Sequence, residues 1–301
     1  MAANPSLTPF QIWLLAARPK TLPAAAAPVV VGTAAAIGDD VFRFWPAFAA
    51  LLGALLIQIG TNFANDVFDY KKGADTTERL GPLRVTQAGL LTPRQVLIGM
   101  WVTFGLATLI GVYLVIIGGW PIVAIGILSI IAGIAYTGGP FPLGYNGLGD
   151  LFVFIFFGLV AVGGTYYVQA GTMSPVAYWA GTAIGLLATA ILVVNNLRDL
   201  ETDRVAGKKT LAVRLGAKGA QVEYFLLLII AYLVPLIMWL TQTSSFWVLL
   251  SWLSLLLTIP LANLMLNEKG RPLNAALAGT ARLELVYGLL FSIGLVVGGI
   301  F

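Results

Sequence analysis

The chain has 301 residues, of which 59% are hydrophobic and only 10% are charged, and its net charge at pH 7 is +4. Soluble domains are about a quarter charged, so this composition predicts an integral membrane protein with several spans. The sequence contains no cysteine and no histidine, which excludes disulfides, thiolate nucleophiles and zinc sites of the usual Cys/His type. Any bound metal is expected to have oxygen ligands, which favours Mg²⁺, with Mn²⁺ as the nearest substitute.

Nine apolar segments, each bounded by polar residues or by Pro and Gly, predict an all-α protein that crosses the membrane nine times. Each segment has roughly 17–24 residues, enough to cross about 30 Å of hydrocarbon. The start "MAANPSLTPFQIW" has no basic region before an apolar stretch, so we expect the first span to be retained. The predicted spans lie near residues 20–38, 46–68, 94–117, 121–137, 150–170, 175–197, 221–241, 246–266 and 281–301.

The positive charges fall almost entirely on one side of such a protein. If the spans alternate, only Arg43 of the 17 Lys and Arg residues lies on the side opposite the N-terminus. Cytoplasmic loops carry the excess of Lys and Arg, so the N-terminus is predicted to be cytoplasmic and the C-terminus external. Two long loops on the cytoplasmic side, near 69–93 and 198–220, are expected to cap the bundle and carry the function. We expect residues 1–301 to form one domain.

Polar residues gather at the predicted cytoplasmic ends of the second and sixth spans. The first cluster has members on one helix face and ends with a further aspartate; it comprises Asn62, Asn65, Asp66, Asp69 and Asp75. The second cluster also shares one helix face and comprises Asn195, Asn196, Asp199 and Asp203. Each cluster is followed by a glycine and a basic, Thr-containing segment, which indicates a weak internal repeat.

A single aspartate at a helix end is most simply a solvated group paired with a nearby Lys or Arg. That explanation fits these clusters poorly, because negative charge is unfavourable at a helix C-terminus and like charges on one face repel each other. Such groups persist chiefly where a cation neutralises them, and oxygen ligands select Mg²⁺ or Mn²⁺. We expect a metal site between the two clusters, with the ligands Asn62, Asn65, Asp69, Asp199 and Asp203.

Basic residues flank both clusters and would repel a metal ion that brought no anion with it. Because Mg²⁺ typically bridges carboxylates and phosphate oxygens, the expected ligand is a diphosphate, here attached to a lipid tail. The G-x-x-x-x-G-K-[ST] pattern of P-loop NTPases is absent, so the expected chemistry is departure of metal-bound diphosphate from an allylic lipid. The candidate diphosphate-binding residues are Lys71, Lys72, Arg79, Arg84, Arg198, Lys208, Lys209 and Arg214.

These motifs resemble those of the UbiA superfamily of intramembrane aromatic prenyltransferases, and most closely its dihydroxynaphthoate branch. The superfamily motif N-D-x-x-D matches the run from Asn65 to Asp69, with Asp75 as the further aspartate. The second motif, D-x-x-x-D, matches Asp199 and Asp203. Longer strings carry the resemblance to the naphthoate branch: "ARPKTLPAAAAPVVVGTA", "NFANDVFDYKKGADTTERLGPLRVTQAG", "YTGGPFPLGYNGLGD" and "NNLRDLETDRVAGKKTLAVRLG".

The resemblance implies a bacterial inner-membrane enzyme whose nine helices surround a central cavity, with the aspartate motifs at its cytoplasmic end. It implies Mg²⁺-dependent transfer of a polyprenyl group from polyprenyl diphosphate to 1,4-dihydroxy-2-naphthoate, with loss of carbon dioxide, giving demethylmenaquinol for menaquinone biosynthesis. The expected catalytic residues are Asp66, Asp69, Asp75, Asp199 and Asp203. An aspartate is expected to deprotonate an acceptor hydroxyl, and the sequence does not single one out. Candidate acceptor-binding residues are Tyr136, Tyr145, Asp150 and Arg282.

Two alternatives remain at this stage. One is a member of the same superfamily with another aromatic acceptor, such as homogentisate; the loop 138–149 has no Lys or Arg, which argues against the 4-hydroxybenzoate and haem branches. The other is a lipid-diphosphate transporter, which would need polar features on the far side of the membrane, where the sequence has almost none. Arg282 and Glu284 are expected to form a surface pair at the start of the last span.

Overall fold

The computed structural model describes residues 7–74 and 80–300, and every regular element in this part of the chain is a helix. The elements of the first half are α1 (Pro9–Ala17), η1 (Pro19–Thr21), α2 (Leu22–Gly38), α3 (Phe44–Lys71), α4 (Pro93–Gly118) and α5 (Trp120–Ala135). Those of the second half are α6 (Gly149–Val153), the π-helical η2 (Phe154–Val160), α7 (Ala161–Ala170), α8 (Pro175–Arg198), α9 (Leu200–Val205), α10 (Leu211–Leu240), the 3₁₀-helical η3 (Phe246–Leu257), α11 (Thr258–Asn267) and α12 (Leu273–Ile300).

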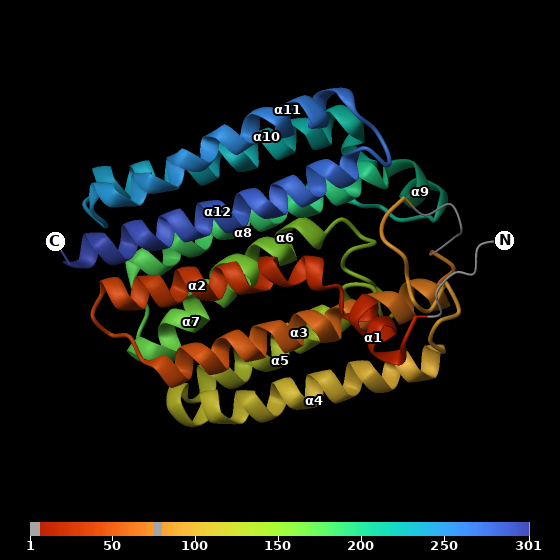
Figure 1. Ribbon diagram of the computed structural model, residues 1–301, viewed down its shortest axis with the longest axis horizontal. Helices are drawn as coiled ribbons and strands as arrows, with labels where there is room; N and C mark the ends of the chain where they lie inside the picture. The colour runs from red at the N-terminus through yellow and green to blue at the C-terminus, as the bar shows by residue number, and fades with distance from the viewer. Residues whose placement is uncertain (1–6, 75–79, 301) are drawn as a thin grey trace.

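The long helices run side by side in an elongated bundle, and α1 and the end of α12 lie at opposite ends of it (Figure 1). Eight segments in the described residues are long and apolar enough to cross a membrane, namely α1–α2, α3, α4, α6–α7, α8, α10, η3–α11 and α12. The predicted all-α membrane class is confirmed. The predicted count of nine is not, because the segment expected at 121–137 is α5, an apolar helix of 16 residues, shorter than the roughly 20 that a span needs.

Two span boundaries differ from the prediction. The first segment begins at Pro9, because α1 and η1 continue into α2. The last begins at Leu273, before the predicted start at 281, so Arg282 and Glu284 lie within α12 and not at its entrance. Polar residues interrupt both extensions, Arg18 and Lys20 in the first and Asn274 and Thr280 in the last, so a search for continuous apolar runs stops short of them.

Helix α3, which holds the first polar cluster, is longer than a membrane span requires. It has 28 residues, about 42 Å at 1.5 Å per residue, whereas the hydrocarbon core is about 30 Å thick. Roughly the last eight residues of the helix include Asp66 and Asp69, and Asn62 lies one turn earlier; all three side chains are buried against other parts of the chain. Its length therefore delivers these side chains to one end of the bundle.

Helix α8 is the central packing element and contacts α10, η2, α12 and α2. Small residues let η2 approach it closely: a Cβ added to Gly185 would lie 2.7 Å from the carbonyl oxygen of Phe154, and one added to Gly158 would lie 2.5 Å from that of Gly181. Close packing through small residues is the usual solution where lipid provides no hydrophobic drive between helices. The contact fixes the start of α6 relative to the C-terminal end of α8.

Candidate active site

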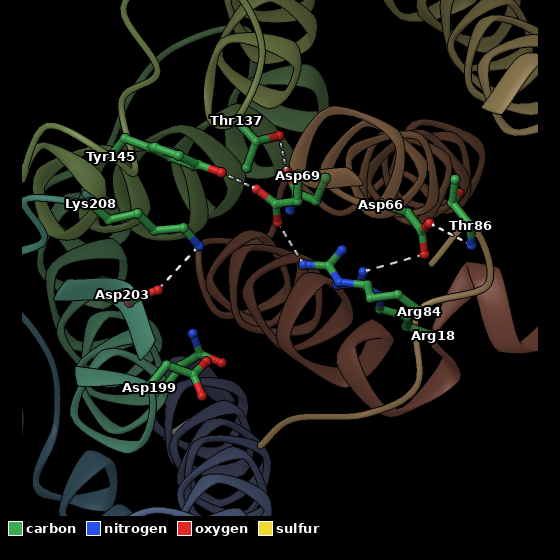
Figure 2. Close-up of polar contacts among 12 residues, drawn as sticks. Arg18, Asp66, Asp69, Arg84, Thr86, Thr137, Tyr145, Asp199, Asp203 and Lys208 are labelled. Atoms are coloured by element: carbon green, nitrogen blue, oxygen red, sulfur yellow. Dashed lines mark hydrogen bonds and ion pairs between the residues drawn. The ribbon is translucent and has the colours of Figure 1, made fainter. Parts of the chain in front are cut away.

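The ends of α3 and α8 come together at the end of the bundle where α1 and α9 lie (Figure 1). Figure 2 shows the resulting cluster, with Asp69 near its centre, Arg84 between Asp69 and Asp66, and Lys208 beside Asp203. The predicted repeat is thus a spatial pair, since both aspartate clusters contribute to one group of polar contacts.

Asp66 holds the loop that follows α3. Its two carboxylate oxygens accept hydrogen bonds from the backbone N–H groups of Val85 (3.2 Å) and Thr86 (3.0 Å). Arg18, in the turn after α1, brings its Nη2 atom to 3.9 Å from the same carboxylate. Asp66 is 1% exposed, so these contacts anchor both the loop and the N-terminal helix to α3.

Asn62 also faces the N-terminal segment. Its amide nitrogen donates to the carbonyl of Ala17 at 2.9 Å and to the hydroxyl of Thr21 at 3.0 Å. Asn65, one turn closer to the cluster, accepts a hydrogen bond from the hydroxyl of Thr137 at 3.0 Å. Of the two asparagines predicted as ligands, the structure therefore turns Asn65 towards the loop after α5 and Asn62 towards α1.

Asp69 forms a buried ion pair. Its Oδ2 atom accepts from Arg84 Nη2 at 2.8 Å and its Oδ1 atom accepts from the Tyr145 hydroxyl at 2.7 Å. The side chains of Arg84 and Asp69 are only 7% and 4% exposed. Hydrogen bonds between ionised groups in such surroundings are among the stronger contacts in proteins.

Tyr145 links the first cluster to the second. The ammonium groups of Lys72 and Lys208 lie 5.0 Å and 4.8 Å from its ring centroid, within the range of cation–π attraction. Lys208 also forms an ion pair with Asp203, at an N–O distance of 3.2 Å. A single tyrosine therefore contacts Asp69 through its hydroxyl and both lysines through its ring.

Arg198 neutralises the end of α8. Its guanidinium contacts both carboxylate oxygens of Asp199 and donates to the side-chain oxygens of Asn195 (2.8 Å) and Asn274 (2.9 Å). The Asn274 amide nitrogen in turn donates to the carbonyl of Leu80 at 3.0 Å. Asn274 thus joins α12, the loop after α3 and the end of α8. Sequence reasoning missed it; its signal is a polar side chain in the first turn of the last helix.

Charges in one cluster shift the pKa of a group in the other. Burial raises the pKa of Asp203, and the negative charges of Asp199 and Asp69 raise it further, while Lys208 acts in the opposite direction. Burial lowers the pKa of Lys72, and the opposing influence of Asp69 is smaller. Carboxylates from α3 and α9 therefore lie within electrostatic range of one another.

Tyr136 and Asp150 lie beside this cluster. Burial raises the pKa of Tyr136, and the charges of Asp150, Asp69 and Asp203 raise it further, so its hydroxyl stays protonated and acts as a donor. Asp150 is 8% exposed, and neither of its carboxylate oxygens has a hydrogen-bond partner in the described residues.

Other predicted residues are not brought into the cluster. Lys71 and Lys209 are exposed, although the Lys209 backbone N–H donates to the Tyr145 carbonyl at 2.7 Å. Asp75 and Arg79 lie outside the described residues. Arg214 donates to the carbonyl oxygens of Lys209 and Asn146 and so ties two loops together.

The expected surface pair on α12 is wrong. Glu284 is 1% exposed and its carboxylate has no hydrogen-bond partner among the described residues, whereas Arg282 is exposed. Both lie in a helix that is apolar along most of its length, and the sequence does not show which of its sides meets the bundle.

The donor chemistry of the cluster suits a hard cation. Asn65, Asp69, Asp199 and Asp203 offer only oxygen atoms, the preferred ligands of Mg²⁺. Within residues 7–74 and 80–300, however, no three carboxylates lie close enough together to hold a metal ion by themselves. Asp69, Asp199 and Asp203 are each paired with a Lys or Arg instead. The residues therefore fit a metal that arrives with an anion able to bind those cations.

A helical membrane bundle with paired aspartate-bearing helix ends is the architecture of intramembrane prenyltransferases, and the chain belongs to the UbiA prenyltransferase family, whose model matches residues 25–298. The chain is 41% identical over 299 residues to the 1,4-dihydroxy-2-naphthoate octaprenyltransferase of Escherichia coli, covering 95% of both chains. It is 38% identical over 304 residues to the enzyme of the same name from Haemophilus influenzae, covering 96% of this chain and 97% of the relative. The resemblance predicted from the motifs is confirmed.

The fold is shared with a solved structure of a UbiA homologue from Archaeoglobus fulgidus, described as bound to DMAPP and Mg²⁺. The TM-score is 0.60 at 16% sequence identity, and the match covers 93% of this chain and 99% of the homologue. At this level of identity the comparison establishes the common fold.

Proposed function

We propose that the protein transfers a polyprenyl group from polyprenyl diphosphate to 1,4-dihydroxy-2-naphthoate with release of carbon dioxide, giving demethylmenaquinol. The observation that carries the diphosphate half is the cluster in which Asp203 lies within electrostatic range of Asp199 and Asp69, each carboxylate balanced by its own cation. The acceptor is supported by the activity for which relatives that match nearly the whole chain are named.

We assign the metal ligands to Asn65, Asp69, Asp199 and Asp203, with Mg²⁺ as the ion and Mn²⁺ as a substitute. Bound there with the diphosphate, the ion would supply electrostatic stabilisation of the leaving group. Arg84, Arg198 and Lys208 would bind phosphate oxygens and so release the carboxylates that they contact in this structure. Asn62 and Asp66 position the N-terminal helix and the loop after α3, in keeping with their contacts.

In this proposal Tyr145 stabilises the allylic cation and Tyr136 binds the acceptor. The Tyr145 ring already contacts two cationic ammonium groups, and an aromatic face of this kind would also stabilise an allylic cation. The Tyr136 hydroxyl is held protonated by its surroundings, so it would donate a hydrogen bond to an oxygen of the acceptor.

The test is an assay of the purified protein in lipid nanodiscs with Mg²⁺, octaprenyl diphosphate and dihydroxynaphthoate. We expect prenylated naphthoquinol and carbon dioxide in equal amounts, and no product in excess EDTA. Parallel reactions with homogentisate and 4-hydroxybenzoate test the alternative acceptors, and shorter donors test the tail length. If no donor and acceptor pair that includes dihydroxynaphthoate gives product, the proposal fails.

We further propose that the short apolar helix α5 also crosses the membrane, as a ninth span. Residues 1–301 then form one domain in the bacterial inner membrane, with the N-terminus and active site cytoplasmic and the C-terminus outside. The basic residues at the active-site end of the bundle support this orientation. Because the chain has no cysteine, single cysteines at Val205, the last residue of α9, and at Gln242, in the turn after α10, report on the two sides. In intact cells, a membrane-impermeant maleimide should label Gln242→Cys and not Val205→Cys; the reverse would invert the topology.

A further inference from the structure

Asp150 is a buried carboxylate with no contact that accounts for it. It is the second residue of α6 and 8% exposed. Neither carboxylate oxygen accepts a hydrogen bond from another described residue. Burying an ionisable group without a partner is costly, and such groups in membrane proteins are found mainly where they serve substrates or protons.

The other aspartates of the site have occupied oxygens. Asp66 accepts two backbone N–H groups, and Asp69 accepts from Arg84 and Tyr145. The two aspartates of the second cluster are held by a guanidinium and by an ammonium group. Hydrogen bonds and nearby positive charge stabilise the ionised form of a carboxylate and so weaken it as a base. No other described residue donates a hydrogen bond to Asp150; the contact of this kind that it has comes from its own backbone N–H.

Asp150 also lies near the side chain of Tyr136. A methyl group placed on Gly149 would come within 3.0 Å of the Tyr136 hydroxyl oxygen, so this hydroxyl lies against the start of α6. Tyr136 is within electrostatic range of Asp150 and also of Asp69 and Asp203. Tyr136 is therefore close enough to sense the charge of Asp150 and of carboxylates in the proposed diphosphate site.

From this geometry we propose that Asp150 is a catalytic residue that takes the proton from the acceptor hydroxyl next to the carboxylate and later returns it. This inference rests on the proposed function and adds the identity of the base. It also assigns Tyr136 as the donor that orients the same acceptor, since its hydroxyl adjoins Asp150.

The electron and proton movements balance without any further reagent. The ring carbon that bears the carboxylate forms a bond to the allylic cation as the neighbouring O–H bond breaks, and the proton goes to Asp150. That carbon then carries both the prenyl group and the carboxylate beside a ketone. The bond to the carboxylate breaks, carbon dioxide leaves, and the electron pair restores the aromatic ring while Asp150 returns the proton to the oxygen. With an ionised acceptor carboxylate, no net proton is released.

The main test compares Asp150→Asn with the wild type and with Glu223→Gln. Glu223 on α10 is a half-buried carboxylate within electrostatic range of Asp150, which makes it a matched control. We expect Asp150→Asn to lower kcat about 10²–10⁴-fold, the usual contribution of a general base, with KM for the acceptor changed less than about threefold. Glu223→Gln should stay within about threefold of the wild type, and Asp150→Glu should recover part of the lost rate.

A pH profile separates a base from a residue that only binds. Without its base, the enzyme depends on acceptor already ionised in solution, so the rate of Asp150→Asn should rise about tenfold per pH unit below the pKa of that hydroxyl. The wild type should be nearly flat over the same interval. The groups facing Asp150 are Tyr136 and Glu223; Tyr136, with its raised pKa, does not ionise there.

A second measurement distinguishes loss of the base from misfolding of the variant. In Asp150→Ala, the cavity left by the carboxylate should let added formate restore activity in a saturable way, whereas formate should not help Asp69→Ala. A wild type without activity would overturn the proposed function itself. If the wild type is active, two results would overturn the assignment of Asp150 and leave the proposed function intact. One is that Asp150→Asn keeps its kcat and loses only acceptor affinity. The other is that Glu223→Gln is the impaired variant.

Discussion

Replacing Arg84 by glutamine separates the two roles assigned to it, partner of Asp69 and ligand of the diphosphate. The Arg84–Asp69 pair has an N–O distance of 2.8 Å and side chains that are 7% and 4% exposed. Removing one partner of a buried pair costs about 3–5 kcal/mol, because the other charge is left uncompensated. Since the Tyr145 hydroxyl still donates to Asp69, we expect a loss near the lower limit, about 3 kcal/mol.

The assay is unfolding of detergent-solubilised protein with EDTA or with millimolar Mg²⁺. In the variant, Mg²⁺ should recover part of the lost stability, because Asp69 is then available to bind it; the wild type should respond less. Arg204→Gln is the control, since the Arg204–Glu201 pair has the same 2.8 Å distance but side chains that are 54% and 76% exposed. Exposed pairs contribute about 0–1 kcal/mol. Equal losses in the two variants, or no difference in their response to Mg²⁺, would refute the reasoning.

Three further predictions concern contacts around the cluster. Tyr145→Phe removes the hydroxyl donor to Asp69 but keeps the ring, so kcat/KM for the prenyl donor should fall about tenfold, as expected for a hydrogen bond to a charged group; unchanged initial rates would contradict it. Asn274→Ala breaks the link between Arg198 and the loop after α3 and should raise KM for the diphosphate while kcat changes little, which steady-state kinetics will show. Asp66→Asn loses one acceptor for the loop N–H groups, so limited proteolysis should cut that loop faster than in the wild type; equal cutting rates would argue against an anchoring role.

The aspartate clusters were predictable because they break strongly apolar segments, and their spacing places Asn62, Asp66 and Asp69 on one arc of a helix. The spacing does not reveal what packs against that arc. Two backbone N–H groups of a distant loop and the carbonyl that ends α1 occupy Asp66 and Asn62. Helical periodicity therefore identified the polar face of α3. It could not show which residues of that face are metal ligands and which hold neighbouring segments in place.

Contacts made by loops were the least predictable. Tyr145 was predicted to bind the acceptor, and that stays a prediction; the contacts of its ring with two lysines and of its hydroxyl with Asp69 were not predicted. Glu284 was expected at the surface and is buried. In both cases the outcome depends on tertiary packing between segments far apart in the chain, which local pattern and composition do not encode.

The central claim is that the two aspartate clusters form one site for a metal-bound diphosphate. The most direct measurement is calorimetric binding of a prenyl thiolodiphosphate, which resists cleavage, to the wild type, Asp69→Asn, Asp199→Asn and the double variant, with and without Mg²⁺. We expect Mg²⁺-dependent binding in the wild type and a severe loss in each single variant. The double variant should bind little worse than either, because the residues act as a unit. Mg²⁺-dependent binding that survives in one single variant, or losses that simply add, would contradict the account.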